Sequence, residues 1–131
     1  MNPYISMIIP AYNEEVKIKD TLESIKGIKE INEIIVVDDG STDKTTKIAS
    51  EIKSEKIVVL KLDKNRGKGY ALNYGLKIAM KNAEIIGFLD ADLGSSANDV
   101  KKLIDPILND EADVVIAKFP PAKKKGGLGF V

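Results

Sequence analysis

The chain has 131 residues, close to the usual length of one domain, and its 44% hydrophobic and 31% charged residues exclude general disorder. Its 20 basic and 20 acidic residues give a formal net charge of zero, so electrostatics offer no argument for nucleic acid as the main partner. Cysteine and histidine are absent, which excludes disulfides, zinc sites built from those residues and histidine general bases within this chain.

The predicted elements alternate along the chain between strands and helices. Short runs rich in isoleucine and valine predict strands over residues 4–9, 33–37, 56–60, 85–89 and 113–117. Amphipathic stretches between them predict helices over residues 14–26, 42–53, 69–81 and 96–107, with Pro106 perturbing the last one. Ser41 or Thr42, and Ser96 or Asn98, are the candidate helix caps. This order predicts an α/β fold, a mostly parallel sheet with helices on both faces.

Two aspartates follow the fourth predicted strand directly, at Asp90 and Asp92. In an extended segment these side chains point the same way, while Ala91 faces the protein. Two neighbouring carboxylates repel each other unless a cation or hydrogen-bond donors intervene. A hard divalent cation, Mg²⁺ or Mn²⁺, binds such carboxylates together with phosphate oxygens, so the pair predicts a metal–diphosphate site. The alternative is an ordinary pair of turn or helix-start aspartates.

The other strands are also followed by polar residues, and ligands of open parallel sheets bind beyond the carboxyl ends of the strands. Asp38 and Asp39 follow the second strand, where a carboxylate could accept hydrogen bonds from a nucleobase or ribose. The basic, glycine-rich residues 65–69 follow the third strand, where Arg66 or Lys68 could reach a diphosphate. Turn formation and helix entry explain parts of both segments equally well. Tyr12, after the first strand, could stack on a base.

Four segments together resemble the family 2 glycosyltransferases of the GT-A fold, including the dolichyl-phosphate mannose synthase-like group. They are Pro10-Ala11-Tyr12-Asn13-Glu14-Glu15, Val36-Val37-Asp38-Asp39-Gly40-Ser41-Thr42-Asp43, Asn65-Arg66-Gly67-Lys68-Gly69 and Asp90-Ala91-Asp92. The resemblance implies a UDP- or GDP-sugar donor and Mg²⁺ or Mn²⁺. It places Pro10, Ala11, Tyr12 and Glu14 around the nucleoside, and Asp39, or alternatively Asp38, on the base. It also places Lys68 near the donor, Asp90 on the ribose or sugar, and Asp92, with Asp90, on the metal.

The resemblance also sets expectations for the rest of the chain. Inverting members of the family use a carboxylate base well beyond the aspartate pair, in an acceptor-binding half. We therefore expect residues 1–117 to form the donor-binding domain, the basic segment 118–131 to lead into an absent acceptor half, and this fragment alone to be inactive. No catalytic residue is assigned. The implied acceptor is a polyprenyl phosphate or a polysaccharide. The alternatives are a nucleotidyltransferase and a non-catalytic nucleotide-binding regulatory module.

Location and assembly are predicted from the same residues. No stretch approaches the roughly 18 apolar residues that a membrane-spanning helix needs, and residues 1–10 lack the basic start of a signal peptide. We therefore expect a cytoplasmic protein, membrane-associated in its full-length form. An uncovered apolar sheet edge near the fifth strand predicts self-association, most simply as a homodimer.

Overall fold

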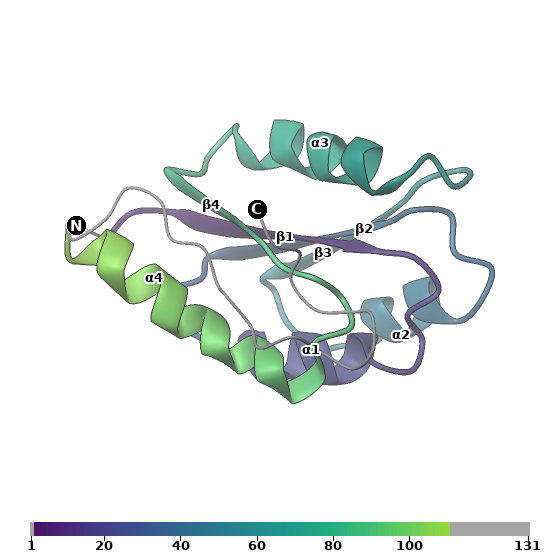
Figure 1. Cartoon of the computed structure of the whole chain (residues 1–131), viewed down its shortest axis with the longest axis horizontal. Coiled ribbons are helices and arrows are strands. Elements are labelled where there is room, and N and C mark those ends of the chain that lie inside the picture. Colours follow the sequence, from purple (N-terminus) through teal and green to yellow (C-terminus); the bar gives the residue numbers. More distant parts are fainter. Residues whose placement is uncertain (1, 111–131) are drawn as a thin grey trace, which may run out of the picture.

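The computed structural model describes residues 2–110, which form one parallel sheet with helices on both of its faces (Figure 1). The strands are β1 (Ile5–Ala11), β2 (Glu33–Asp38), β3 (Ile57–Lys61) and β4 (Ile85–Phe88), in the spatial order β3-β2-β1-β4. The helices are α1 (Ile18–Ile25), α2 (Thr45–Ser50), α3 (Lys68–Ala79), the 3₁₀ helix η1 (Gly94–Val100) and α4 (Lys101–Leu108). The predicted α/β fold is confirmed.

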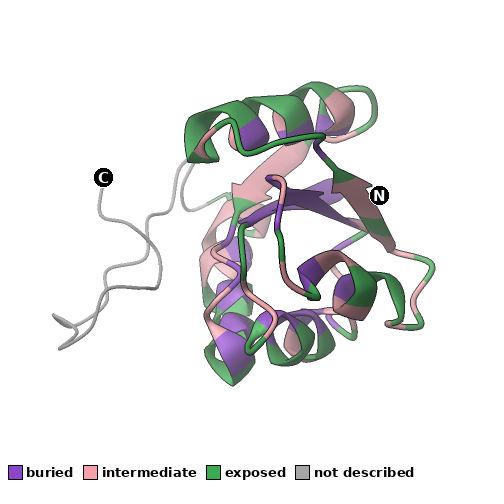
Figure 2. Ribbon diagram, turned by 90° about the vertical axis from the view of Figure 1, so that its right-hand side faces the viewer, coloured by how far each residue is buried: buried purple, intermediate pink, exposed green. Residues whose placement is uncertain are grey.

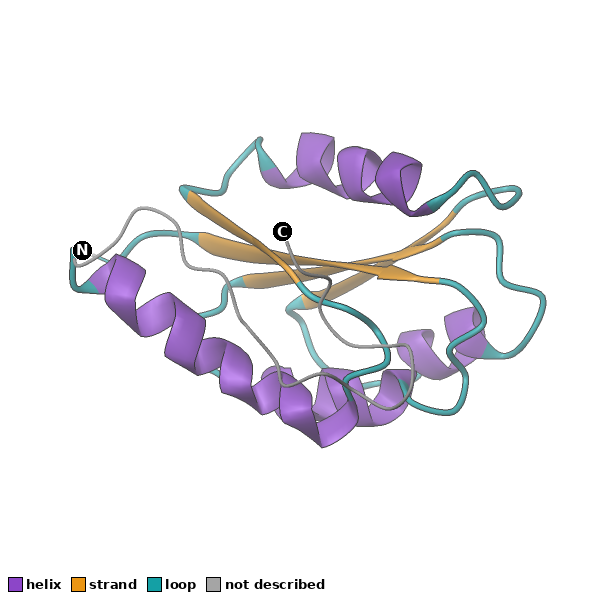
Figure 3. Ribbon diagram, in the orientation of Figure 1, coloured by secondary structure: helices purple, strands orange, loops and turns teal. Residues whose placement is uncertain are grey.

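The sheet separates two apolar cores. Figure 3 shows α1, α2 and α4 beneath the sheet and α3 above it. Successive side chains of a strand point to opposite faces, so Met7 and Ile9 belong to the larger core below, while Ile8 belongs to the smaller core under α3. Both faces of β1 and β2 are therefore buried, as Figure 2 shows in purple. This double burial explains why the strands are nearly continuous runs of isoleucine and valine.

Helix α3 lies unusually close to the sheet because small residues face it. Ala71, Gly75 and Ala79 form its buried side. A Cβ atom at Gly75 would lie only 2.6 Å from Cγ2 of Ile8, so a glycine is required there by the close approach. The large side chains of α3 consequently lie on its flanks and its outer surface.

The ends of several helices differ from the sequence-based prediction. Helix α1 begins at Ile18, after the turn formed by residues 15–17. The N–H groups of Glu14 and Glu15 bond to Thr45 and Asp43 after β2. Helix α2 spans only Thr45–Ser50, and no side chain caps it from its N-cap residue. The predicted helix over 96–107 is divided into η1 and α4, and α4 continues through Pro106 and ends two residues later. The predicted strand over 113–117 and the segment 118–131 lie outside the described residues.

Strand β4 is the last strand of the described part of the chain, and β1 is its neighbour on one side. An apolar groove runs between β4 and α4, lined among others by Ile85, Phe88, Leu103 and Ile107. Across residues 2–110, no helix has both the length and the apolar character needed to cross a membrane.

Candidate functional site

The loops after the four strands meet at one edge of the sheet, because all four strands are parallel. The N–H of Asp39 donates to the carbonyl of Ala11 at 2.8 Å, which joins the ends of β2 and β1. The ammonium of Lys68, at the start of α3, lies 2.8 Å from Oδ1 of Asp90, after β4. The fold therefore brings together the four segments that the sequence singled out.

Asp38 holds the turn that follows β2. Its side chain is fully buried, its Oδ1 accepts the N–H of Ser41 at 2.8 Å, and its Oδ2 accepts the hydroxyl of Thr46. Both carboxylate oxygens thus have partners within the chain. These two bonds explain how the turn enters α2.

Asp39 fixes the glycine-rich loop that precedes α3. Its Oδ1 accepts the N–H of Arg66 at 2.7 Å, and its Oδ2 accepts the N–H of Gly67 at 2.9 Å. The side-chain amide of Asn65 lies 3.3 Å from the same Oδ2. Gly67 has a φ of +100°, a backbone conformation that suits glycine. The carboxylate therefore places Lys68 next to Asp90, a role that the sequence analysis missed.

A second set of hydrogen bonds joins the loop after β1 to the loop after β2. The N–H of Asn13 donates to the hydroxyl of Ser41, and the N–H of Glu14 donates to the hydroxyl of Thr45, both at 2.8 Å. Asn13 in turn accepts the N–H of Thr42 at 2.9 Å and has a φ of +52°. These side chains fix the position of Glu14, while Tyr12 beside it remains 45% exposed.

Acidic side chains gather at this edge. Burial raises the pKa of the Glu14 carboxyl above its usual value, and the negative charges of Asp92, Asp43 and Asp90 raise it further. Ala91 between the two aspartates is buried, and its carbonyl accepts the hydroxyl of Thr21 on α1 at 2.6 Å. The predicted burial of Ala91 is confirmed, although residues 91 and 92 form a turn and not the extended segment that the prediction assumed. The edge disfavours additional negative charge and favours a cation.

The carboxylates at this edge fit a cation whose other ligands are phosphate oxygens and water. Within residues 2–110, no three acidic side chains are arranged so that they could hold a metal ion by themselves. Mg²⁺ and Mn²⁺ need only one or two carboxylates when phosphate oxygens and water complete their coordination. Asp90 and Asp92 could supply such a pair, and Lys68 lies beside them to meet an anionic group.

A sequence model of the family described as "Glycosyl transferase family 2" matches residues 6–129, which is nearly the whole chain. The chain belongs to glycosyltransferase family 2. This confirms the resemblance that the four segments indicated.

Curated members of family 2 match the chain over only part of their own length. A UDP-N-acetylglucosamine–dolichyl-phosphate N-acetylglucosaminyltransferase of Methanococcus voltae is 35% identical, over 96% of this chain and 60% of the relative. A dolichyl-phosphate β-glucosyltransferase of Saccharomyces cerevisiae is 42% identical, over 79% of this chain and 34% of the relative. The chain thus spans between about a third and three fifths of these two family 2 enzymes.

A solved enzyme structure shares the fold. The glucosyl-3-phosphoglycerate synthase of Mycobacterium tuberculosis, solved with Mn²⁺ and UDP-glucose, is 32% identical with a TM-score of 0.69. The match covers 83% of this chain and 40% of that chain. Another structure of the same enzyme contains Mn²⁺, UDP and the product glucosyl-3-phosphoglycerate. The GT-A assignment of the sheet is therefore confirmed.

The structure brings all the predicted site residues of this family 2 chain to the carboxyl edge of the sheet. They are Pro10, Ala11, Tyr12, Glu14, Asp38, Asp39, Lys68, Asp90 and Asp92. Pro10 and Ala11 are buried as the last residues of β1, whereas Tyr12 and Lys68 are exposed. The residues that sequence reasoning missed are the loop organisers, namely Asn13, Ser41, Thr45 and Asn65. Polar side chains between a strand and a helix could have indicated this role, but the same residue types are equally common in ordinary turns.

Proposed function

We propose that this family 2 chain binds a UDP-sugar together with Mn²⁺ or Mg²⁺ and transfers its hexose to an acceptor. The observation that carries the proposal is the acidic edge formed by Glu14, Asp90 and Asp92, with Lys68 beside it. A nucleoside diphosphate with its cation has the charge pattern that this edge complements. Family membership supports the transfer chemistry, and UDP and Mn²⁺ in the related synthase support this donor and this metal.

Asp92, with Asp90, would hold the cation, and Lys68 would meet the diphosphate. When bound, the cation supplies a Lewis acid that stabilises the negative charge of the leaving diphosphate. Lys68 can add its positive charge to the same group because it lies at the mouth of the site and is exposed. Asp39 positions Lys68 by binding the two N–H groups that precede it in the loop.

The nucleoside would lie over the ends of β1 and β2. Tyr12 presents an exposed ring there, which can stack on a base, and Pro10 and Ala11 form the floor beneath it. We assign Asp39 to the base, as the family resemblance implies, with Asp38 as the alternative. Both oxygens of each carboxylate also accept hydrogen bonds that hold a loop of the site. Glu14 would lie near the ribose, close enough to Asp90 and Asp92 for their negative charges to raise its pKa.

The acceptor we favour is a polyprenyl phosphate, because the names of several relatives specify dolichyl phosphate. A polysaccharide is the second option, since another relative is a poly-β-1,6-N-acetyl-D-glucosamine synthase. No catalytic base is assigned among the described residues. The division into a donor-binding domain over 1–117 and a basic segment over 118–131 stays a prediction, because residues 111–131 are not described.

Calorimetric titration of the chain with UDP, with and without Mn²⁺, tests the metal site. We expect Mn²⁺ to strengthen UDP binding and Asp92→Ala to remove that gain, since one charged ligand is worth roughly 1.5–3 kcal/mol, or about 10- to 150-fold in affinity. Asp99→Asn is the matched control, because Asp99 is an exposed carboxylate on η1, away from this edge. Equal UDP affinity with and without Mn²⁺ in the unmodified chain would overturn the metal role.

A thermal-shift comparison of UDP, GDP and ADP tests the donor. A ligand at about 100 times its Kd adds about 2.7 kcal/mol of stability, so a bound nucleotide is readily detected. We expect UDP to give the largest shift, and Asp39→Asn to reduce the preference among the bases. A larger shift with ADP than with UDP would contradict the assignment of this donor.

A further inference from the structure

The segment around α3 carries a segregated positive charge. Between Asp63 and Glu84 every charged residue is basic, although the whole chain has a formal net charge of zero. The basic residues of this segment are Lys64, Arg66, Lys68, Lys77 and Lys81. All the acidic residues therefore lie elsewhere in the chain. The positive charges of this segment create a local electrostatic field that favours anions.

Large side chains lie on the same outer surface of α3. Tyr70, Tyr74 and Lys77 are spaced by four and three residues, so they share one side of the helix, separate from the side that carries the buried Ala71 and Gly75. Tyr70 is 46% exposed, Tyr74 39% and Met80, just after the helix, 65%. Figure 2 shows this outer surface of the upper helix in green. We call the set of Arg66, Tyr70, Tyr74, Lys77, Met80 and Lys81 the outer face of α3.

Arg66 belongs to this face through its contact with a tyrosine. Its guanidinium carbon lies 5.1 Å from the centre of the Tyr70 ring, within the range of a cation–π interaction. One guanidinium nitrogen also lies 3.5 Å from Oδ1 of Asp63, but that aspartate is itself highly exposed, so it neutralises Arg66 only in part. The charge and the aromatic surface are thus held together on one side of the molecule.

We propose that the outer face of α3 docks on the surface of an anionic lipid bilayer. Single exposed apolar residues are ordinary, but here two tyrosines, a methionine and three basic residues share one surface without any acidic residue of the helix. Tyrosine rings prefer the headgroup region, long basic side chains reach the lipid phosphates, and the methionine can enter the acyl boundary. Such binding is reversible and depends on lipid charge.

Docking on this face would also orient the molecule. The first residue of α3, Lys68, pairs with Asp90 at the carboxyl edge of the sheet, so this edge lies at the amino end of the docked helix. The bilayer surface would then run beside the acidic edge. The inference goes beyond the proposed function and does not depend on it, since neither nucleotide nor metal is required for docking.

Co-sedimentation of the 131-residue chain with vesicles tests the proposal. The vesicles are phosphatidylcholine alone, or phosphatidylcholine with phosphatidylglycerol. We expect binding only to the anionic vesicles, weakened by added salt. Lys77→Gln with Lys81→Gln should weaken it about 25-fold, at about fivefold per lysine. Tyr70→Ser with Tyr74→Ser should also weaken binding, but leave its salt dependence unchanged.

Matched controls separate this face from a general effect of charge. Lys19→Gln with Lys47→Gln removes the same charge from α1 and α2, on the opposite face of the sheet, and should leave vesicle binding nearly unchanged. Equal binding to neutral and anionic vesicles would overturn the proposal. So would loss of binding only on Lys123→Gln, Lys124→Gln and Lys125→Gln together. Tighter binding to single-stranded RNA than to anionic vesicles would show that the face recognises nucleic acid instead. Circular dichroism and thermal melting confirm that each variant folds.

Discussion

Asp43 is one of the residues that join the loop after β1 to the loop after β2. Its carboxylate accepts the N–H of Thr45 at 2.9 Å, the Thr45 hydroxyl at 2.5 Å and the N–H of Glu15 at 3.2 Å. Burial raises the pKa of this carboxyl, but the hydrogen bonds donated by Thr45 and Glu15 outweigh burial and hold the pKa below its usual value of 3.8. The charged form of Asp43 therefore stabilises the fold.

Asp43→Asn should destabilise the protein at neutral pH by roughly 1–3 kcal/mol, because an amide replaces a charged acceptor. The folded pKa is lower than the unfolded pKa, so the stabilising effect is present above 3.8 and is lost as the pH falls through the folded value. Urea unfolding of both proteins at pH 7 and below pH 3.8 measures it. The difference between them should shrink in acid, and a constant difference would contradict the assignment of the effect to the charge.

Gly40 allows the loop after β2 to contact the loop after β3. Its φ is +75°, and a Cβ atom there would lie 2.5 Å from the backbone nitrogen of Asn65 and from the carbonyl carbon of Lys64. The left-handed conformation alone costs a residue with a side chain roughly 1–2 kcal/mol. The glycine is therefore required both by its own backbone and by the neighbouring loop.

Gly40→Ala should lower the free energy of unfolding by about 2 kcal/mol or more, since the strain and the displaced loop both contribute. It should also weaken UDP binding, because the displaced loop carries Lys68. Gly27→Ala is the control, because a Cβ atom at Gly27 meets nothing within 4 Å. Chemical denaturation and calorimetry of the two variants test this. Similar stability of both variants would show that the loops can separate at no cost.

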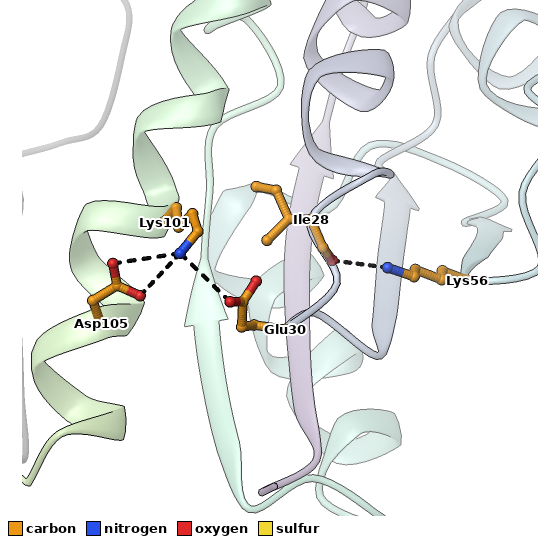
Figure 4. A network of polar contacts seen from close by, with 5 residues as sticks. All are labelled: Ile28, Glu30, Lys56, Lys101 and Asp105. Carbon is orange, nitrogen blue, oxygen red and sulfur yellow. Dashed lines mark hydrogen bonds and ion pairs between the residues drawn. The ribbon is translucent and has the colours of Figure 1, made fainter.

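At the level of elements, α4 is tied to the segment between α1 and β2 by one lysine. Figure 4 shows the ammonium of Lys101 between Glu30, at 3.5 Å, and Asp105, at 3.3 Å. The carbonyl of Ile28, in the same segment, accepts a hydrogen bond from the ammonium of Lys56 at 2.8 Å.

The carboxylate of Glu30 depends on Lys101 for its neutralisation. Its Oε1 atom is buried and has no hydrogen-bond partner. The pKa of Glu30 is lowered first by a backbone hydrogen bond and then by the charge of Lys101.

Lys101→Met should therefore loosen α4, because it leaves Glu30 without the cation that faces it. Thermal melting of Lys101→Met, Glu30→Gln and the double variant gives the coupling between the two side chains. We expect the two changes to be non-additive. Lys26 and Glu23, which pair within α1 alone, provide a matched exposed pair whose loss should not affect α4. Strictly additive effects of Lys101→Met and Glu30→Gln would show that the contact adds no stability.

The elements also show how far the sequence predicted the structure. The strands were predicted to within about two residues, because isoleucine and valine buried on both faces leave a continuous apolar signal. The start of α3 was predicted to within one residue, but the starts of α1 and α2 were not. The predicted cap Ser41 accepts the N–H of Asn13 in another loop instead of capping its own helix. The site edge was predictable from parallel strand ends, but the role of Asp39 in holding the loop of Arg66 depends on tertiary contacts that no local pattern encodes.

At the level of the whole molecule, the outer edge of β4 is an apolar surface. Within residues 2–110 this edge has no partner strand, and Phe88 on β4 is 46% exposed beside the groove along α4. Unpaired strand edges with apolar side chains favour association between chains. We therefore expect the 131-residue chain to form dimers at high concentration, as the sequence also predicted.

Phe88→Lys should shift this equilibrium towards the monomer, because a lysine on an edge strand opposes pairing. Sedimentation equilibrium over a range of concentrations measures the change. Val58→Lys, on the other edge strand β3, is the control, since Val58 is also exposed. Dimers that survive Phe88→Lys and dissociate on Val58→Lys would place the contact at β3 instead.

The strand order has a consequence for how the chain folds as it is synthesised. Of the four described strands β1 emerges first, yet it occupies the interior of the sheet, and its two neighbours come from distant parts of the sequence. Ser6 pairs with Glu33, whereas Ile5 pairs with Ile85. One side of β1 must therefore wait until most of the described chain has left the ribosome. During that interval its unpaired backbone is a natural target for a chaperone, and the sheet closes late, when β4 arrives.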